Sequence, residues 1–198
     1  MIEKETTKDG LIEEFYDNGQ LKLRRNYKDG KPEGILEEFH ENGQLKHKGN
    51  HKDGKPDGLH ERFYKNGQLF TKSNYKNEKL NGLSEKFYEN GQLKERVNWK
   101  NGKHEGVMEI YSENSQLEYR TNWKNGKMDG LWEKFDEDGN RVKTKQYKNG
   151  TLQGEGKQNT EEELDEYLES IGIKMVPDNH PIYNEPPFII FSNKKPKK

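Results

Sequence analysis

The chain has 198 residues, and its 35 Lys and Arg residues nearly balance its 36 Asp and Glu residues, for a formal net charge of −1. Charged residues make up 36% and hydrophobic residues only 27%, and the sequence contains no cysteine. Its longest apolar run is the four residues 188–191, whereas a membrane-spanning helix needs about 20. The composition therefore excludes a membrane-spanning helix, a disulfide scaffold and a cysteine-ligated metal. The balanced charge predicts no nucleic-acid partner.

The chain is nevertheless expected to fold, because aromatic residues make up 11% of it and disordered chains are poor in aromatics. Residues 1–9 form a polar N-terminal lead-in without the apolar stretch of a signal peptide. A cytoplasmic location is therefore the default expectation.

A repeat of 24 residues organises residues 10–154, since glycine recurs at this spacing without any insertion. The recurring glycines are Gly10, Gly34, Gly58, Gly82, Gly106, Gly130 and Gly154. They enclose six copies of one unit. When positions are counted from each glycine as zero, position 3 is always glutamate, position 5 is always Phe or Tyr, and position 18 is always lysine.

Two turn signals divide each copy into two strands. The first is Asn-Gly at positions 8 and 9 in four of the six copies, as in Asn18-Gly19, and the second is Asn-Gly or Asp-Gly at positions 19 and 20 in five of the six, as in Asp29-Gly30. Both dipeptides favour β-hairpins because their residues tolerate positive φ. The sequence thus predicts an all-β fold, an elongated single-layer antiparallel β-meander of six hairpin repeats with about twelve strands.

The register of the first hairpin follows from the apolar pattern. A three-residue loop with a glycine bulge pairs position 5 with position 11, whereas a two-residue loop pairs position 5 with position 12. We favour the bulged register because we expect it to gather positions 1, 5, 11 and 17 on one buried face. Positions 4, 12, 14, 16 and 18 would then form a polar face. So thin a core predicts a twisted, curled sheet whose copies stabilise one another.

Residues 155–198 leave the repeat and predict a C-terminal helix cap and a basic tail. Thr160 and Glu163 have the spacing of a capping box, and an amphipathic helix is expected over residues 161–171. Its apolar face comprises Leu164, Tyr167, Leu168 and Ile171. We favour a cap on the last repeat, and the alternative is a docking element for a partner. Residues 188–191 are a short strand candidate.

The strings W-K-N-G-K-x-x-G at Trp99–Gly106 and Trp123–Gly130 and F-Y-x-N-G-Q-L-K at Phe87–Lys94 resemble the MORN-repeat variant. More closely, residues 10–154 resemble the YwqK-type antitoxin family of bacteria. The resemblance implies an extended sheet of hairpins. It also implies a non-catalytic antitoxin or immunity role, in which the protein binds a cognate toxin and blocks it. MORN repeats elsewhere act as scaffolds or are linked to membrane lipids.

No spacing typical of a catalytic set occurs in the sequence, and no metal site is expected. The six histidines fall at different repeat positions. His47 and His51 would chelate together on a helix, but on a strand they would lie about 13 Å apart. We expect the glutamates at position 3 to be paired within the sheet, and the less favoured alternatives are a calcium ladder or a general acid.

Binding surfaces are expected where the copies differ, at positions 2, 4, 13 and 15. In the fifth copy these positions include Met108, Ile110 and Tyr119, which together with Trp99 and Trp123 form the candidate partner-binding site. The alternative is that these side chains fill the local core. Lysines at positions 18 and 21 form two rows that suit an acidic surface or lipid head groups, or that protect the sheet edge from aggregation.

The sequence thus predicts a protein that is not an enzyme and uses no cofactor. It is expected to bind a protein partner, a cognate toxin, and to neutralise it by steric occlusion. The alternative class is a structural scaffold or a peripheral membrane adaptor, and a hydrolase or other enzyme is least favoured. The oligomeric state stays open, because the strand expected at residues 11–16 has no obvious cover.

Overall fold

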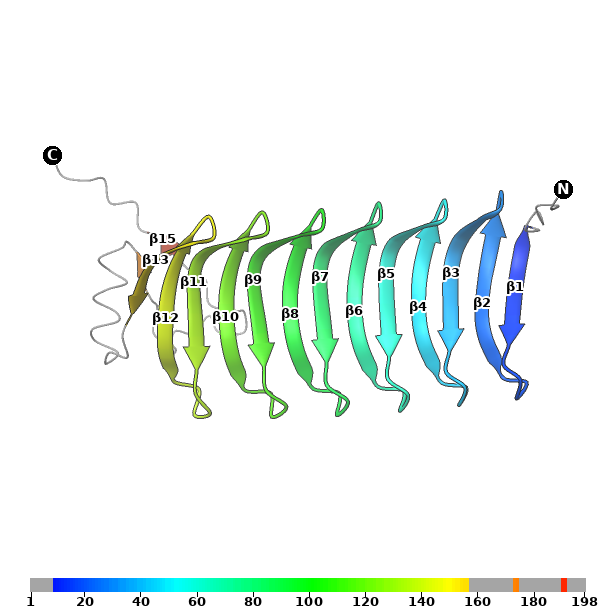
Figure 1. The fold of residues 1–198 in the computed structure, drawn as a ribbon, viewed down its shortest axis with the longest axis horizontal. Helices are drawn as coiled ribbons and strands as arrows, with labels where there is room; N and C mark the ends of the chain where they lie inside the picture. Colours follow the sequence, from blue (N-terminus) through cyan, green and yellow to red (C-terminus); the bar gives the residue numbers. More distant parts are fainter. Residues whose placement is uncertain (1–8, 157–172, 175–189, 192–198) are drawn as a thin grey trace. The chain divides into compact units, whose positions relative to one another are not determined.

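The computed structural model describes residues 9–156, 173–174 and 190–191. The strands of the repeat region are β1 (Gly10–Phe15), β2 (Leu21–Lys28), β3 (Lys31–Phe39), β4 (Leu45–Lys52), β5 (Lys55–Phe63), β6 (Leu69–Lys76), β7 (Lys79–Phe87), β8 (Leu93–Lys100), β9 (Lys103–Tyr111), β10 (Leu117–Lys124), β11 (Lys127–Phe135), β12 (Arg141–Lys148) and β13 (Thr151–Gly156). They form one 13-stranded sheet whose spatial order is the order of the sequence (Figure 1). The predicted all-β meander of hairpin repeats is confirmed.

The hairpin inside each copy has the predicted bulged register. In the first copy Phe15 pairs with Leu21 and Glu14 with Leu23, so that Lys22 is an extra residue on β2. Two backbone hydrogen bonds of 2.8 and 2.9 Å close the loop between positions 6 and 10. The three-residue tip ends with a glycine of positive φ, which is the geometry of a type I turn followed by a glycine bulge.

The hairpin between copies is a two-residue turn. Lys28 pairs with Lys31, and Asp29 and Gly30 between them have φ values of 51° and 69°. Positive φ at both residues defines the type I′ turn, whose twist matches that of the flanking strands. These turns lie along the upper edge of the sheet in Figure 1, and the longer loops lie along the lower edge.

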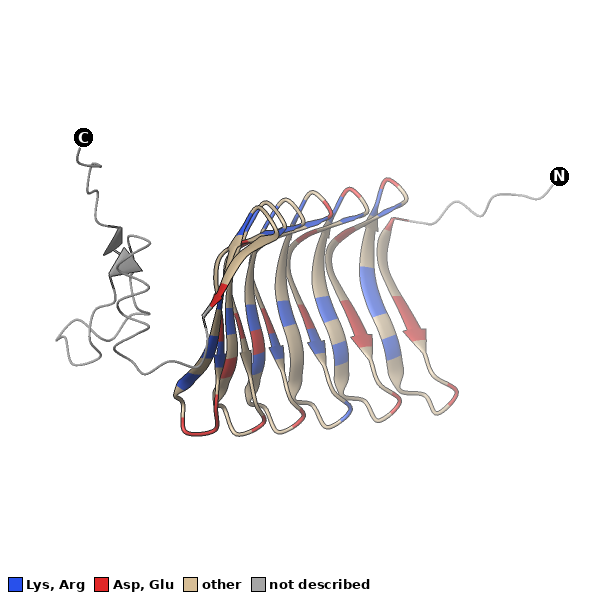
Figure 2. Cartoon of the chain, turned by 60° about the vertical axis from the view of Figure 1, so that its left-hand side comes forward, with Lys and Arg blue, Asp and Glu red and all other residues tan. Residues whose placement is uncertain are grey.

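The recurring glycine at position 0 marks a bend in the sheet. Between β2 and β3 the pairing passes from Arg25–Leu36 to Tyr27–Pro32, so β3 has two more residues than β2 over this step. Gly34 lies in the resulting bulge with a φ of 80°, which residues with a side chain rarely adopt. Bulges bend a strand, and Figure 2 shows the strands bent so that the upper hairpins lean over. Backbone conformation therefore explains why this position is always glycine.

The predicted grouping of positions on two faces is confirmed for positions 1, 5 and 11, which share one face, but it is wrong for positions 14, 16 and 17. In the first copy Leu11 pairs with Asn26 and Glu13 with Arg24, so positions 16 and 14 share the face of positions 1 and 3. Tyr27 at position 17 alternates with Asn26 and points to the opposite face. Positions 1, 5, 11 and 17 therefore do not form one stripe. The extra residue at position 12 inverts the alternation for the rest of the strand, so position 17 lies on the face opposite to position 11.

We call the face with positions 2, 4, 13, 15, 17 and 22 the aromatic face, and the face with positions 1, 3, 5, 14 and 16 the leucine face. In the first copy the aromatic face carries Ile12, Glu14, Leu23, Arg25, Tyr27 and Pro32. On the leucine face, five residues expected in the core are 38–58% exposed, namely Leu11, Ile35, Leu59, Leu83 and Val107. Within the described ranges, the buried hydrophobic residues are Val97 and Leu131, at 3% and 5% exposure. The core is as thin as the composition implies.

Hydrogen bonds between successive copies compensate in part for this thin core. Tyr16 donates its hydroxyl hydrogen to Phe39 O at 2.7 Å. Tyrosines one position after the strand repeat this bond in the third and fourth copies, at 2.8 Å each. Asn18 Nδ2 donates to Glu41 O at 3.1 Å, and three later copies repeat that bond. Each repeat is thus tied to its neighbour along the lower edge, as in other repeat proteins.

The chain divides into two compact units, residues 1–154 and 155–198. In the second unit, β14 (Ile173–Lys174) pairs with β15 (Ile190–Phe191), so the end of the predicted strand at 188–191 is extended. The helix predicted at 161–171 lies outside the described residues. In the ranges that the structure describes, no helix is long and apolar enough to cross a membrane.

Candidate functional site

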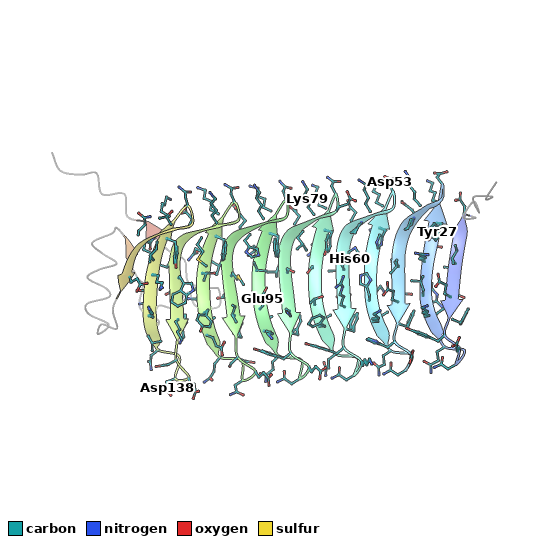
Figure 3. The ribbon with its side chains drawn as sticks, in the orientation of Figure 1. Tyr27, Asp53, His60, Lys79, Glu95 and Asp138 are labelled. Atoms are coloured by element: carbon teal, nitrogen blue, oxygen red, sulfur yellow. The ribbon has the colours of Figure 1, made fainter. Side chains whose placement is uncertain are left out.

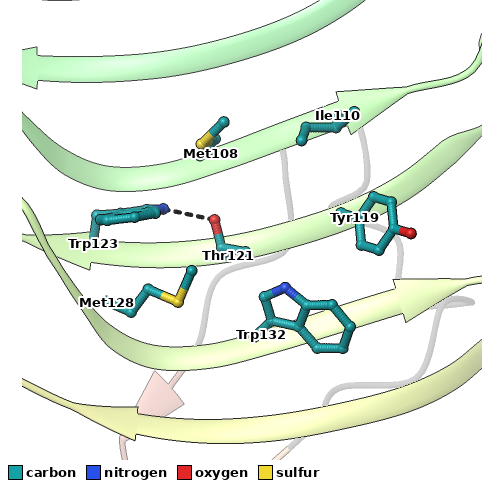
Figure 4. Close-up of a pocket in the computed structure, with 7 residues that line it drawn as sticks. All are labelled: Met108, Ile110, Tyr119, Thr121, Trp123, Met128 and Trp132. Atoms are coloured by element: carbon teal, nitrogen blue, oxygen red, sulfur yellow. Dashed lines mark hydrogen bonds between the residues drawn. The ribbon is translucent and has the colours of Figure 1, made fainter. Parts of the chain in front are cut away.

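A hollow of about 280 Å³ opens on the aromatic face across β9, β10 and β11 (Figure 4). Its lining comprises Met108, Ile110, Tyr119, Thr121, Trp123, Met128 and Trp132. The register brings these side chains together, because Ile110 pairs with Tyr119 and Thr121 pairs with both Met108 and Trp132. Residues paired across adjacent strands lie close enough for their side chains to touch.

The lining is aromatic and its interior polar groups satisfy each other. Trp123 Nε1 donates to Thr121 Oγ1 at 2.7 Å (Figure 4), and Thr121 is only 7% exposed. The rings of Tyr119 and Trp132 lie 5.7 Å apart between centroids, tilted by 44°. The surface of the hollow is therefore apolar, and the Trp123 indole N–H and the Thr121 hydroxyl oxygen are already hydrogen-bonded to each other.

Four of the five residues in the predicted partner-binding site line this hollow: Met108, Ile110, Tyr119 and Trp123. Trp99 does not line it. Its ring lies 4.1 Å from that of His104, which in turn lies 4.8 Å from the ring of Trp123. Trp99 therefore belongs to the packed row beside the hollow. That the site binds a partner stays a prediction.

The predicted site left out three lining residues, Thr121, Met128 and Trp132, although Thr121 stands at position 15, one of the variable positions. Trp132 stands at position 2 of the sixth copy, which is one of the variable positions, so the variation among copies could have indicated it. Met128 stands at position 22, which also varies and carries Pro32 in the first copy. The variation of position 22 could have indicated Met128 as a candidate. That its side chain lies on the aromatic face follows only from the observed pairing of Trp123 with Met128.

Charged side chains of opposite sign lie on the two sides of the hollow. On the β11–β12 side, Lys134 pairs with Tyr119 and Lys145 pairs with Trp132. The Lys145 ammonium lies 5.8 Å from the centroid of the Trp132 ring. On the β8 side, Glu95 pairs with Ile110. The surroundings of the hollow are therefore electrostatically asymmetric.

Three histidines gather on the aromatic face of β4 and β5. His60 Nε2 lies 2.9 Å from Asn50 O, so it carries the proton and leaves Nδ1 as acceptor for His47 Nε2 at 3.1 Å. Burial, followed by the neighbouring His60, lowers the pKa of His47 to about 4. Burial also lowers the pKa of His60. The ring of His51 lies 5.2 Å from that of His60, and Gly49 leaves room because a Cβ there would lie 2.2 Å from His60 Nδ1.

The leucine face carries a ladder of ion pairs between positions 3 and 14. Arg24 lies 2.8 Å from Glu13 and 3.6 Å from Glu37, which also contacts Lys48. Later copies repeat the pairing with Lys72, Arg96 and Arg120. The glutamates are thus paired within the sheet, as expected. Among the described residues, no group of three or more His, Asp or Glu side chains is placed to hold a metal.

Lysines flank the upper hairpins, where Lys79 and Asp53 are labelled in Figure 3 and blue segments mark the turns in Figure 2. Lysines at positions 18 and 21 pair directly across each of five hairpins, Lys28–Lys31, Lys52–Lys55, Lys76–Lys79, Lys100–Lys103 and Lys124–Lys127. All of them are exposed. The predicted lysine rows therefore meet in like-charge pairs at one edge of the sheet.

A family model described as MORN repeat variant matches residues 8–29, 32–53, 56–77, 80–101, 105–125 and 128–149. These segments cover more than half of the chain, one for each observed repeat. The chain therefore belongs to the MORN repeat variant family. The match concerns the repeat family as a whole, and the narrower likeness to YwqK-type antitoxins stays part of the proposal below.

No curated protein matches the chain. Among solved structures, it is similar to one titled crystal structure of accessory secretory protein 1,2 and 3 in Streptococcus pneumoniae. The similarity has a TM-score of 0.19 and 14% identity over 64% of this chain. The match spans only 19% of the length of that other chain. This likeness carries no argument about function.

Proposed function

We propose that this chain is a non-catalytic antitoxin or immunity protein that binds a cognate toxin and neutralises it by steric occlusion. It acts in the cytoplasm and needs no cofactor. The observation that carries the proposal is the hollow on the aromatic face, which gathers Met, Tyr and Trp side chains on an otherwise charged repeat sheet. The bent sheet would lay this face over the active surface of the toxin.

The size and the lining of the hollow support a protein partner over a small molecule. Pockets for small ligands usually hold about 300–1,000 Å³, and this hollow of about 280 Å³ lies at the low end of that range and is open to solvent. Met, Tyr and Trp are enriched in protein interfaces, where a few aromatic anchors carry most of the binding energy. The extended surface of a repeat sheet also suits a macromolecular partner.

The repeat supplies substitutions that test the hollow with little risk to the fold. Position 4 carries Lys86 and Lys134 in neighbouring copies, so Ile110→Lys introduces a side chain that this position already accommodates. The matched control is Leu36→Ser, which removes an apolar side chain from the same face outside the hollow. Position 2, where Leu36 stands, carries Ser84 in the fourth copy.

The experiment is affinity capture with the tagged full-length chain from cells that produce it, with stoichiometry measured by quantitative mass spectrometry. We expect one dominant protein at one-to-one with the wild type and with Leu36→Ser, and its loss with Ile110→Lys. Expression of the captured protein alone should stop growth, and co-expression of the chain should restore it. Many weakly captured proteins, or growth arrest that the chain does not relieve, would contradict the proposal.

A second candidate function, a scaffold that docks on an anionic membrane surface, is favoured by the lysine pairs of the upper hairpins. Like charges directly opposite each other destabilise a hairpin, so their recurrence in five hairpins favours a role outside the fold. Juxtaposed lysines attract anionic lipids by about 1 kcal/mol each. The chain should then co-sediment with phosphatidylserine vesicles, and added salt should release it. Equal binding to phosphatidylcholine vesicles would rule this function out.

A further inference from the structure

We propose that the hollow receives an acidic–apolar segment of the partner protein. One bulky apolar side chain of this segment fills the hollow, and a neighbouring Asp or Glu side chain lies beside Lys134 of β11. The inference rests on the proposed function, because it specifies the partner chemistry at the same site.

The lining calls for an apolar anchor. Met108, Ile110 and Met128 present only apolar atoms to the hollow, apart from the thioether sulfurs. The indole N–H of Trp123 is hydrogen-bonded to the hydroxyl oxygen of Thr121. A polar group placed against Met108, Ile110 and Met128 would lose its water without gaining a partner, which costs free energy. An aliphatic or aromatic side chain has no hydrogen bonds to water that it could lose.

The charged side chains beside the hollow determine which charge the bound segment carries and in which direction it lies. Lys134 stands directly opposite Tyr119 and Lys145 directly opposite Trp132, so positive charge adjoins the hollow on the β11–β12 side. Glu95 stands opposite Ile110 on the β8 side. Complementary potentials across an interface fix register and exclude wrong partners. Glu95 also pairs with Lys86 of β7, so opposite charges balance on that side. Carboxylates of the bound segment therefore lie toward Lys134 of β11.

The same charges argue against a cationic ligand. Aromatic clusters such as Tyr119, Trp123 and Trp132 are also used to bind quaternary ammonium groups. Here the Lys145 ammonium lies 5.8 Å from the Trp132 ring centroid, so it already interacts with that ring and repels a second cation. Single-stranded nucleic acid prefers ring faces open for stacking, whereas Tyr119 and Trp132 are half-buried and tilted by 44° to each other.

The test is selection of random displayed peptides on the full-length chain, followed by affinity measurement with the enriched peptides in fluorescein-labelled form. We expect enriched peptides to contain Trp, Phe or Leu next to Asp or Glu, and Ile110→Lys to abolish their binding. Lys134→Glu should weaken binding by about fivefold, the effect of an ion pair worth about 1 kcal/mol. The matched control is Lys65→Glu, which makes the same charge change at an exposed lysine of a lower loop.

The outcomes separate this inference from the proposed function. Peptides with an apolar anchor but no acidic preference, weakened equally by Lys134→Glu and Lys65→Glu, would overturn the inference and leave the proposed function standing. Peptides whose binding is insensitive to Ile110→Lys would count against both. Tight binding of oligothymidylate that Trp132→Ser abolishes would replace the protein segment with single-stranded nucleic acid.

Discussion

Single residues that depart from the repeat pattern have local physical reasons. Arg141 stands at position 11, where the other copies carry leucine, and its Nη1 lies 2.9 Å from Glu133 Oε1. The same copy carries Thr144 at position 14, where the other copies carry Lys or Arg. In this copy the cation that pairs with the position 3 glutamate is therefore Arg141 at position 11 instead of a residue at position 14. Glu133, which is only 5% exposed, thus keeps an ion-pair partner.

We expect Arg141→Leu to lower the free energy of unfolding by about 3 kcal/mol, because it leaves the Glu133 carboxylate buried without its cation. Leucine is the residue that position 11 otherwise carries, so the change does not disturb the strand. Arg24→Leu breaks a rung whose side chains are 45% and 33% exposed and should cost less than about 1 kcal/mol. Urea unfolding measures both, and equal costs would contradict the role of burial.

Ser115 is a second departure, since it replaces the turn glycine of the other copies at a φ of 63°. Left-handed backbone costs an L-residue about 1 kcal/mol relative to glycine. The exposed hydrogen bond from Ser115 Oγ to Gln92 Oε1 at 2.9 Å offsets part of this cost, so Ser115→Gly should stabilise the protein by less than about 1 kcal/mol. The control is the reverse substitution, Gly139→Ser, at the same repeat position. Gly139 has a φ of 82°, and a Cβ there would meet no heavy atom beyond its chain neighbours within 4 Å. This substitution should destabilise the protein by about 1 kcal/mol. A stability that falls with both substitutions would contradict this explanation.

The hairpins as elements were largely predictable, because Asn-Gly and Asp-Gly dictate turn types that local backbone physics alone decides. The pairing of Phe15 with Leu21 follows from the loop length. The assignment of faces was not predictable from the same pattern. Lys22, one extra residue, reverses the faces of the rest of its strand, and apolar residues occur on both faces. With so little apolar surface to bury, the hydrophobic pattern did not decide between the alternatives.

The contact between β4 and β5 predicts a pH dependence of stability. His47 has its pKa lowered to about 4, first by burial and then by His60, from an ordinary value of 6.5. Between these two values the unfolded chain binds more protons than the native state, so the free energy of unfolding falls as the pH is lowered. After allowance for the half-exposed side chain, we expect a loss of about 1 kcal/mol between pH 7 and pH 5.

Urea unfolding at the two pH values measures this loss, and His47→Thr should reduce it. Threonine is the residue at the same position in the third copy, Thr71. His40→Tyr is the control, since tyrosine is the residue at that position in three other copies. The dependence should survive in this control. A loss that persists unchanged in His47→Thr would contradict the assignment.

At the scale of the whole molecule, the repeat sheet is a series of nearest-neighbour interfaces. Strand order follows sequence order throughout the sheet, and hydrogen bonds join each copy to the next along the lower edge. The candidate site lies within β9 to β11. The sequence predicted four of its residues, and Thr121 and Trp132 also stand at variable positions. Only Met128 required the pairing between strands.

Removal of one whole repeat should therefore leave the rest of the sheet intact. Deletion of residues 59–82 joins Gly58 to Leu83 and preserves the 24-residue phase. We expect a folded protein of lower stability by circular dichroism, with partner binding retained. Deletion of residues 59–81 shifts the phase by one residue and should disrupt strand alternation. Equal behaviour of the two deletions would contradict the nearest-neighbour description.

The central claim is that the hollow on the aromatic face holds a protein partner. Isothermal titration of the purified partner into the chain and its two variants tests it most directly. We expect one-to-one binding by the wild type and by Leu36→Ser, and at least a tenfold loss of affinity for Ile110→Lys, since a buried charge at an anchor position costs more than about 1.4 kcal/mol. Unchanged affinity in Ile110→Lys would contradict the claim and place the binding surface elsewhere on the sheet.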